Sequence, residues 1–260
     1  MVQSSEGDKN AQAYAPEAMS EIANLDQFYH SPAGRLVSYL LRRHMQSKLS
    51  LNTDIDRLGF GYPFMLMPKS NLPVLVPSEM GALAYGAPMN ILTSSVHSHA
   101  WPIASESMNQ IIMCHGLEYC FDGAACLSEA NRVLASAGEL FLIVPNRRSL
   151  WVRDDKTPLG HGRPFSKGQI TKLLTKTGFE INEVRRALFL PPSFTNLPLR
   201  LAQTIDRLGS YSWALFGGVI IIRATKLRYA TKGKSARAMM PVLSPVIKPT
   251  AKPALGRTSQ

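Results

Sequence analysis

Short, continuously apolar segments alternate with longer segments of helical period along the chain, and this alternation constrains the fold more than any other feature. Four of the apolar segments are VLVP, NILTS, NQIIMCH and ELFLIVP, at residues 74–77, 90–94, 109–115 and 139–145. Such segments are typical of strands buried on both faces of a sheet. Helical segments lie among them, at 31–49, 126–138 and 166–179. The pattern therefore predicts an α/β domain with a mostly parallel sheet.

Two more strands are expected near the end of this domain, around residues 181–190 and 218–226. Residues 197–209 can supply a helix between them, but this helix is less clearly marked than the others. The order of the last strands in the sheet therefore stays open.

The net charge of +11 is not spread evenly over the chain. After Asp206 there is no acidic residue, whereas ten Lys or Arg lie between Arg207 and Arg257. The first 206 residues thus hold 19 of the 29 basic side chains and all 18 acidic ones, for a net charge of +1. This distribution argues against a uniformly basic, nucleic-acid-binding domain.

Composition divides the chain into a domain at 21–229 and two tails, 1–20 and 230–260, which are expected to be disordered. The C-terminal tail is rich in Pro, Lys, Ser and Ala, so we expect it to be solvated; contact with RNA or anionic lipid is the alternative. No run of eighteen apolar residues predicts a transmembrane helix, and the N-terminus lacks the apolar core of a signal peptide. Three cysteines fit a reducing compartment. We therefore expect a cytoplasmic protein.

The segment RLGFGYPF, at 57–64, contains the G-x-G spacing of a nucleotide-binding turn. Glycines at the end of a strand let the backbone approach a ligand. Glu79 follows Gly61 by 18 residues, close to the spacing at which a carboxylate accepts hydrogen bonds from a ribose. An ordinary tight turn with a solvated glutamate explains the same residues equally well.

The segment CHGLEYC, at 114–120, directly follows a predicted strand. His115 is a candidate proton acceptor or cofactor contact; the alternative is a histidine bonded to nearby backbone. The histidines and cysteines here lack C-x2-C or H-x3-H spacing, so we predict no metal site.

Residues 144–170 are unusually rich in polar and aromatic side chains for a connection after a strand. Loops at this edge of an α/β sheet position substrates. The candidates for binding a polar or anionic acceptor are Asn146, Arg147, Trp151, Arg163, Ser166 and, also as a candidate base, His161. The alternative is an ordered loop capped by Ser166, with its arginines in surface ion pairs.

Taken together, these segments resemble the class I S-adenosylmethionine-dependent methyltransferase superfamily, and within it type 11-like members from an uncharacterised alphaproteobacterial subgroup. The resemblance spans about residues 25–228. It rests on EANRVL at 129–134, GEL at 138–140 and PN at 145–146, and on the ordered segments FYHSPAGR, LGFGYPF, HGLEYC, PNRRSLW and GHGRPFS.

The resemblance implies a doubly wound, mostly parallel, Rossmann-like sheet of seven strands. It also implies S-adenosylmethionine as cofactor, over the carboxyl edge of the first four strands. The family pattern places Gly59, Gly61 and Tyr62 near its methionine part, Glu79 at its ribose, His97 near the adenine, and Cys114 and His115 near the sulfonium.

The implied reaction is methyl transfer to an unidentified small molecule or macromolecule. The sulfonium is itself an excellent leaving group, so the protein mainly positions the acceptor and excludes water. His115 and His161 are the candidate catalytic bases. The sequence departs from the family pattern at Gly59, where an acidic residue is usual, and at Pro63, where a glycine is usual. A catalytically inactive methyltransferase-like domain that acts as a binding or scaffold protein is the alternative.

Overall fold

The computed structural model describes residues 20–45, 55–67, 72–81, 93–154 and 157–227. All of these residues belong to one compact unit, Met1–Arg228. The two tails proposed from composition, 1–20 and 230–260, lie outside the described residues except for the backbone of Ser20.

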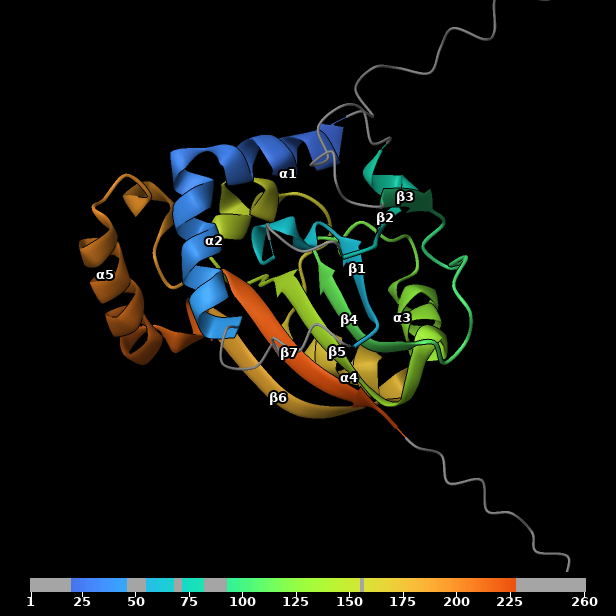
Figure 1. Cartoon of the computed structure of the whole chain (residues 1–260). Coiled ribbons are helices and arrows are strands. Elements are labelled where there is room, and N and C mark those ends of the chain that lie inside the picture. The colour runs from blue at the N-terminus through green and yellow to red at the C-terminus, as the bar shows by residue number, and fades with distance from the viewer. Residues whose placement is uncertain (1–19, 46–54, 68–71, 82–92, 155–156, 228–260) are drawn as a thin grey trace, which may run out of the picture. The chain divides into compact units, whose positions relative to one another are not determined.

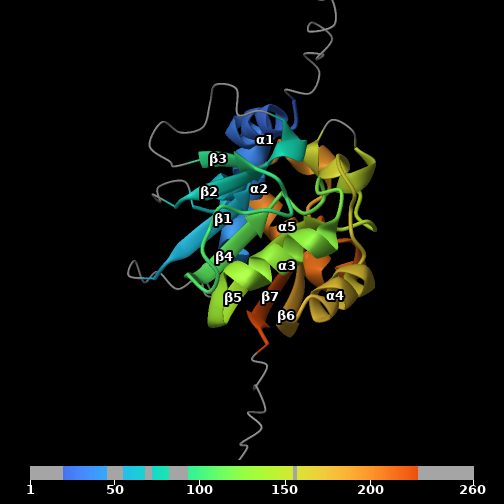
Figure 2. The same cartoon turned by 90° about the vertical axis from the view of Figure 1, so that its right-hand side faces the viewer.

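A single sheet of seven strands forms the centre of the domain (Figure 2). Its order is β3-β2-β1-β4-β5-β7-β6, and all neighbouring pairs are parallel except those of β7, which runs antiparallel to β5 and β6. The strands are β1 (Arg57–Gly61), β2 (Val74–Pro77), β3 (Thr93–Val96), β4 (Met108–Cys114), β5 (Leu134–Pro145), β6 (Phe179–Ala187) and β7 (Val219–Lys226). This arrangement confirms the predicted doubly wound, mostly parallel sheet.

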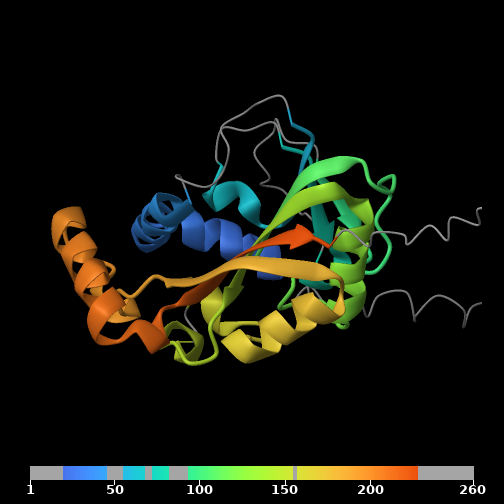
Figure 3. The same ribbon diagram turned by 90° about the horizontal axis from the view of Figure 1, so that it is seen from below.

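Helices cover both faces of the sheet (Figures 1 and 3). They are α1 (Ser20–His30), α2 (Pro32–Met45), α3 (Gly123–Val133), α4 (Lys167–Lys176) and α5 (Leu199–Ser212). In β5, Phe141 and Ile143 pack with α1 and α2, whereas Leu140, Leu142 and Val144 pack with α3 and α4. Full burial of each such side chain stabilises the fold by about 1.5–3 kcal/mol. Because helices cover both faces of the sheet, the central strands have apolar residues at nearly every position of their sequence.

Two helices on the same face begin at side chains that satisfy free backbone N–H groups. Asp122 accepts hydrogen bonds from the backbone of Ala124 and Ala125 at the start of α3, and Ser166 and Gln169 form a capping box at the start of α4. Helix α3 ends at Val133, five residues earlier than the predicted helix. Leu134 is buried and pairs with Met108 of β4, so the chain passes from helix into strand without a loop.

The pairing of β7 with β5 and β6 settles the strand order that the sequence left open. Helix α5 connects β6 to β7 and lies beyond α2, away from the sheet (Figures 1 and 3). After this helix the chain returns to the sheet as β7, which lies between β5 and β6.

Candidate active site

The carboxyl end of β1 carries the glycines of the G-x-G motif. Gly59 lies inside the strand, and Gly61 ends it with a φ of +80°. A Cβ atom at Gly61 would lie 2.4 Å from the carbonyl oxygen of Cys114 in β4, and the next residue, Tyr62, donates its backbone N–H to that oxygen at 2.5 Å. Gly61 therefore permits a close contact between β1 and β4 that a side chain would prevent.

Glu79 lies directly after β2, as the sequence predicts for a ribose-binding carboxylate. Its Oε1 accepts a hydrogen bond of 2.5 Å from the hydroxyl of Ser98, which follows β3, and its Oε2 accepts one of 3.3 Å from Ser78. The side chain is half-buried. Each carboxylate oxygen has two lone pairs, so Glu79 keeps acceptor capacity at this edge of the sheet.

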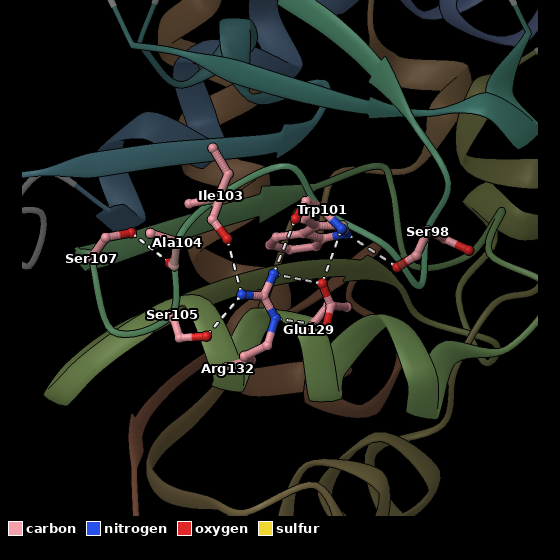
Figure 4. A network of polar contacts seen from close by, with 8 residues as sticks. All are labelled: Ser98, Trp101, Ile103, Ala104, Ser105, Ser107, Glu129 and Arg132. Carbon is pink, nitrogen blue, oxygen red and sulfur yellow. Dashed lines mark hydrogen bonds and ion pairs between the residues drawn. The ribbon is translucent and has the colours of Figure 1, made fainter.

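The loop after β3 is held against α3 by Arg132 (Figure 4). The guanidinium donates to both carboxylate oxygens of Glu129, to the carbonyl oxygens of Trp101 and Ile103, and to the hydroxyl of Ser105. These bonds lower the pKa of the Glu129 carboxyl and raise the pKa of Arg132. Arg132 thereby fixes the loop that carries Ser98 to Glu79.

His97, predicted to lie near the adenine, is exposed in this same loop. Its ring stacks on that of His99 at 5.8 Å between centroids. The loop is anchored below by Trp101, which is buried, stacks on Phe60 of β1 and donates its indole N–H to the carbonyl of Ser98. His97 thus directly precedes Ser98, in a loop that the buried Trp101 holds against β1.

His115 directly follows β4 and is completely buried, as is Cys114 before it. Its Nε2 lies 2.6 Å from the hydroxyl of Tyr29 in α1, and its Nδ1 lies 2.9 Å from Oε1 of Glu118. Burial, and then the nearby Cys114 and Glu118, raise the pKa of Tyr29. The phenol therefore stays protonated, and the imidazole lies between this hydroxyl and the carboxylate of Glu118. The partners of this histidine are side chains rather than the backbone groups of the simpler hypothesis.

Helix α1 joins this buried pair to two other segments of the site. Tyr62 donates its hydroxyl to Asp26 of α1 at 2.7 Å and stacks on Tyr29 at 5.5 Å. Glu21 precedes Asp26 and Tyr29 in α1 by more than one helical turn. Its carboxylate accepts a hydrogen bond of 3.2 Å from Tyr119 and lies 2.9 Å from Nδ1 of His161. The two predicted catalytic histidines are thus held by the same helix. The sequence alone predicts no role for Glu21, Asp26 or Tyr29.

The predicted acceptor-binding residues divide between two cavities. His161 and Trp151 line a cavity of about 570 Å³, together with residues of α1, the start of α2 and residues 192–195. Arg147 and Arg163 line a second cavity of about 350 Å³, against the start of α3. The structure therefore does not bring these four side chains to one place.

Asn146 and Trp151 also have structural partners. The buried Asn146 amide donates to the carbonyl oxygens of Leu215 and Gly217, and the indole of Trp151 donates to that of Leu190. Ser166 acts as the helix cap proposed in the alternative interpretation of this loop. Among the described residues, no three or more His, Cys, Asp or Glu side chains are grouped so that they could hold a metal ion.

No protein-family model and no curated protein matches this sequence. Solved structures do match it. One is an S-adenosylmethionine-dependent methyltransferase from Thermotoga maritima, described as a possible histamine N-methyltransferase. The match has a TM-score of 0.57 at 17% identity and covers 79% of this chain and 99% of that one. The chain has the methyltransferase fold.

Two other solved structures show a likeness at lower similarity. A methyltransferase from Archaeoglobus fulgidus matches with a TM-score of 0.52 at 13% identity, over 77% of this chain and 97% of that one. The [4+2]-cyclase SpnF matches with a TM-score of 0.52 at 12% identity, over 81% of this chain and 93% of that one. At these identities the likeness establishes the fold alone.

Proposed function

We propose that the protein is an S-adenosylmethionine-dependent methyltransferase with a small-molecule or macromolecular acceptor. One observation carries the proposal: the carboxylate of Glu79 lies at the carboxyl end of β2, beside the strand that ends in Gly61. In an open α/β sheet, ligands bind outside the carboxyl ends of the strands where the strand order reverses. Here that point lies between β1 and β4, next to β2.

The residues at this edge fit a nucleoside with a charged tail. Glu79 has acceptor capacity for the two ribose hydroxyls, and the exposed His97 offers a flat surface near it for a base. Gly59, Gly61, Tyr62, Cys114 and His115 would border the methionine part, as the family resemblance implies. Bound there, S-adenosylmethionine would supply an activated methyl group, and the protein would align the acceptor and exclude water.

The cavity of about 570 Å³ is the proposed acceptor site, because α1 connects it to the end of β4. His161 lines this cavity and lies 2.9 Å from Glu21, so it is the better placed of the two candidate bases. His115 is fully buried, and we assign it to positioning through Tyr29. Binding of the acceptor by Asn146, Arg147, Trp151 and Arg163 remains a prediction.

A specific observation favours the second candidate, a non-catalytic binding domain. Tyr62 and Tyr29 are buried and stacked at the end of β1, beside the glycines that would face the methionine part. Asp26 holds Tyr62 in that position through its hydroxyl. In this candidate, the two rings fill space that the cofactor would otherwise use.

Calorimetric titration of S-adenosylmethionine and its demethylated product into the purified protein separates the two candidates. A methyltransferase is expected to bind both with micromolar dissociation constants, and Glu79→Ala is expected to weaken binding by about tenfold or more. Glu180→Ala, an exposed glutamate of β6, is the matched control and should bind as the wild type does. Absence of binding by folded protein would contradict the methyltransferase and support the binding domain.

A further inference from the structure

The outer side of α5 and of the residues that follow it carries a dense group of exposed apolar side chains. Tyr211 is 83% exposed, and its neighbours in the group are 38–57% exposed: Leu201, Leu208, Trp213, Leu215 and Phe216. We call these six residues the α5 apolar surface. Soluble monomers rarely expose so many large apolar side chains in one segment, and such surfaces mark interaction sites.

The arrangement on the helix directs these side chains outward. Leu201 and Leu208 are seven residues apart, and therefore lie on one face of α5, with Tyr211 one turn further. The opposite face contains Ala202, Asp206 and Gly209, which are buried. The inner face of α5 thus consists of small and polar residues together with the partly buried Ile205, whereas Leu201, Leu208 and Tyr211 face away from the domain.

Hydrogen bonds to residues 189 and 190 hold α5 and the following Trp213 in this orientation. Oδ1 of Asp206 accepts hydrogen bonds of 2.6 Å and 3.2 Å from the backbone N–H groups of Phe189 and Leu190. The indole of Trp213 donates to the carbonyl of Phe189 at 3.1 Å. Because these bonds would be broken if the helix rotated, the apolar surface cannot turn inward at low cost.

The exposed charged side chains of α5 itself have one sign. Arg200 and Arg207, also seven residues apart, are exposed beside Leu201 and Leu208. The one acidic residue of α5 is Asp206, which is buried and lies 3.7 Å from Nε2 of His44. A partner for this surface has to match apolar side chains bordered by positive charge.

We propose that α5 and the residues up to Phe216 bind the surface of a membrane that contains anionic phospholipids. Leu, Phe, Trp and Tyr enter the boundary between headgroups and acyl chains, and Arg side chains bind lipid phosphates. The helix lies in the interface, since its 14 residues span about 21 Å, less than the roughly 30 Å of a hydrocarbon core. In the described part of the chain, no helix is both long and apolar enough to cross a bilayer.

A second copy of the chain fits this surface less well. In a two-fold symmetric contact, the same surface of each copy meets its partner. Arg200 and Arg207 of both copies would then border one interface, without an acidic side chain of α5 to pair with them. Anionic headgroups provide that pairing. The membrane contact is also independent of the proposed methyl transfer.

Co-sedimentation of the full chain with phosphatidylcholine vesicles, with and without phosphatidylglycerol, tests the proposal. We expect binding to the anionic vesicles and a blue shift in fluorescence from Trp213, the exposed member of the three tryptophans. The double variant Leu208→Ser/Tyr211→Ser should weaken binding by about tenfold or more. The matched control is Phe121→Ser, an 80% exposed phenylalanine before α3, which should bind as the wild type does.

Three outcomes would overturn the proposal. The first is no binding of the wild type to anionic vesicles. The second is that the double variant binds as well as the wild type, as it would if binding depended on residues 230–260 instead. The third is a concentration-dependent dimer that the double variant abolishes while vesicle binding is absent. Circular dichroism and thermal melting show whether the variants stay folded, which is expected because both substituted side chains are exposed. Titration of S-adenosylmethionine should be unaffected, so failure of this proposal is distinguishable from failure of the proposed function.

Discussion

The hydroxyl of Tyr29 in α1 lies 2.6 Å from Nε2 of His115, although the two residues are 86 positions apart in the sequence. His115 directly follows β4. Both side chains are buried. The contact attaches α1 to the carboxyl edge of the sheet at the position where the cofactor's reactive end would lie. In the proposed methyltransferase the helix therefore belongs to the site, and changes in it should alter the site.

Tyr29→Phe removes the hydroxyl and leaves Nε2 of the buried histidine without this partner. We expect the free energy of unfolding to fall by about 1–3 kcal/mol, the cost of an unsatisfied buried polar group. Urea unfolding measures the change. Tyr39→Phe removes an exposed hydroxyl that accepts a hydrogen bond from Gln203, and should change stability by less than about 0.5 kcal/mol. Equal effects of the two substitutions would contradict the importance of the buried contact.

Gly61→Ala should destabilise the domain, because glycine at this position has a φ of +80° and its Cβ would lie 2.4 Å from a carbonyl oxygen of β4. We expect a loss of at least about 2 kcal/mol from strain and overpacking. Gly168→Ala, at a position of α4 with open space around it, is the matched control and should raise stability by about 0.5–1 kcal/mol. Thermal melting should therefore shift in opposite directions for the two variants, and a shift in the same direction would be inconsistent with the observed packing.

The ion pair of Glu129 with Arg132 should make stability depend on acid pH. Hydrogen bonds from Arg132 lower the pKa of Glu129 in the folded protein below the ordinary value of about 4.3. The pair therefore contributes stability above that ordinary value, and the contribution is lost as the pH falls through the lower, folded value.

Glu129→Gln should reduce stability at pH 7 and have a diminishing effect toward about pH 3. Urea midpoints at a series of pH values would show the wild-type and variant curves converging. Glu180→Gln removes an exposed carboxylate and should follow the wild-type curve. Parallel wild-type and Glu129→Gln curves would show that the pair does not carry the pH dependence.

The three cysteines should be unreactive in the folded protein. All are buried, and burial raises the pKa of Cys114 and of Cys126, so these thiols stay protonated at pH 8. A thiol reagent such as dithionitrobenzoate should modify the native protein slowly and modify three thiols after denaturation. A thiol that reacts rapidly in the native state would indicate that one of these positions opens.

The sequence predicted the strands whose two faces are both buried, and it was less informative elsewhere. Segments 74–77 and 139–145 lie in β2 and β5, and segment 109–115 lies in β4 except for its last residue, because a buried strand needs apolar residues at every position. The predicted strand at 90–94 overlaps β3 in part, and residues 90–92 lie outside the described part of the chain. Strand β1 contains both glycines of the motif, which a local pattern assigns to a turn.

The site was only partly predictable, since its contacts join residues far apart in the sequence. Glu79 was identifiable from its place after a strand. The roles of Tyr29 and Glu21 depend on partners 86 and 140 residues away, and nothing in the helix itself marks them. Helical period predicted α5 but could not show that its large apolar side chains face outward, since that depends on what the rest of the chain leaves uncovered.

The position of β7 has a consequence for how the protein is made. Strand β6 lies at the edge of the sheet, and its neighbour β7 is the last described strand to be synthesised. Until Val219–Lys226 has left the ribosome, β6 has no partner in this sheet and β5 has an open side. Unpaired strand edges promote association between chains. Translation that stops before residue 219 should therefore release a chain in which the edges of β5 and β6 that β7 normally covers are exposed. These edges are then free to pair with strands of neighbouring molecules.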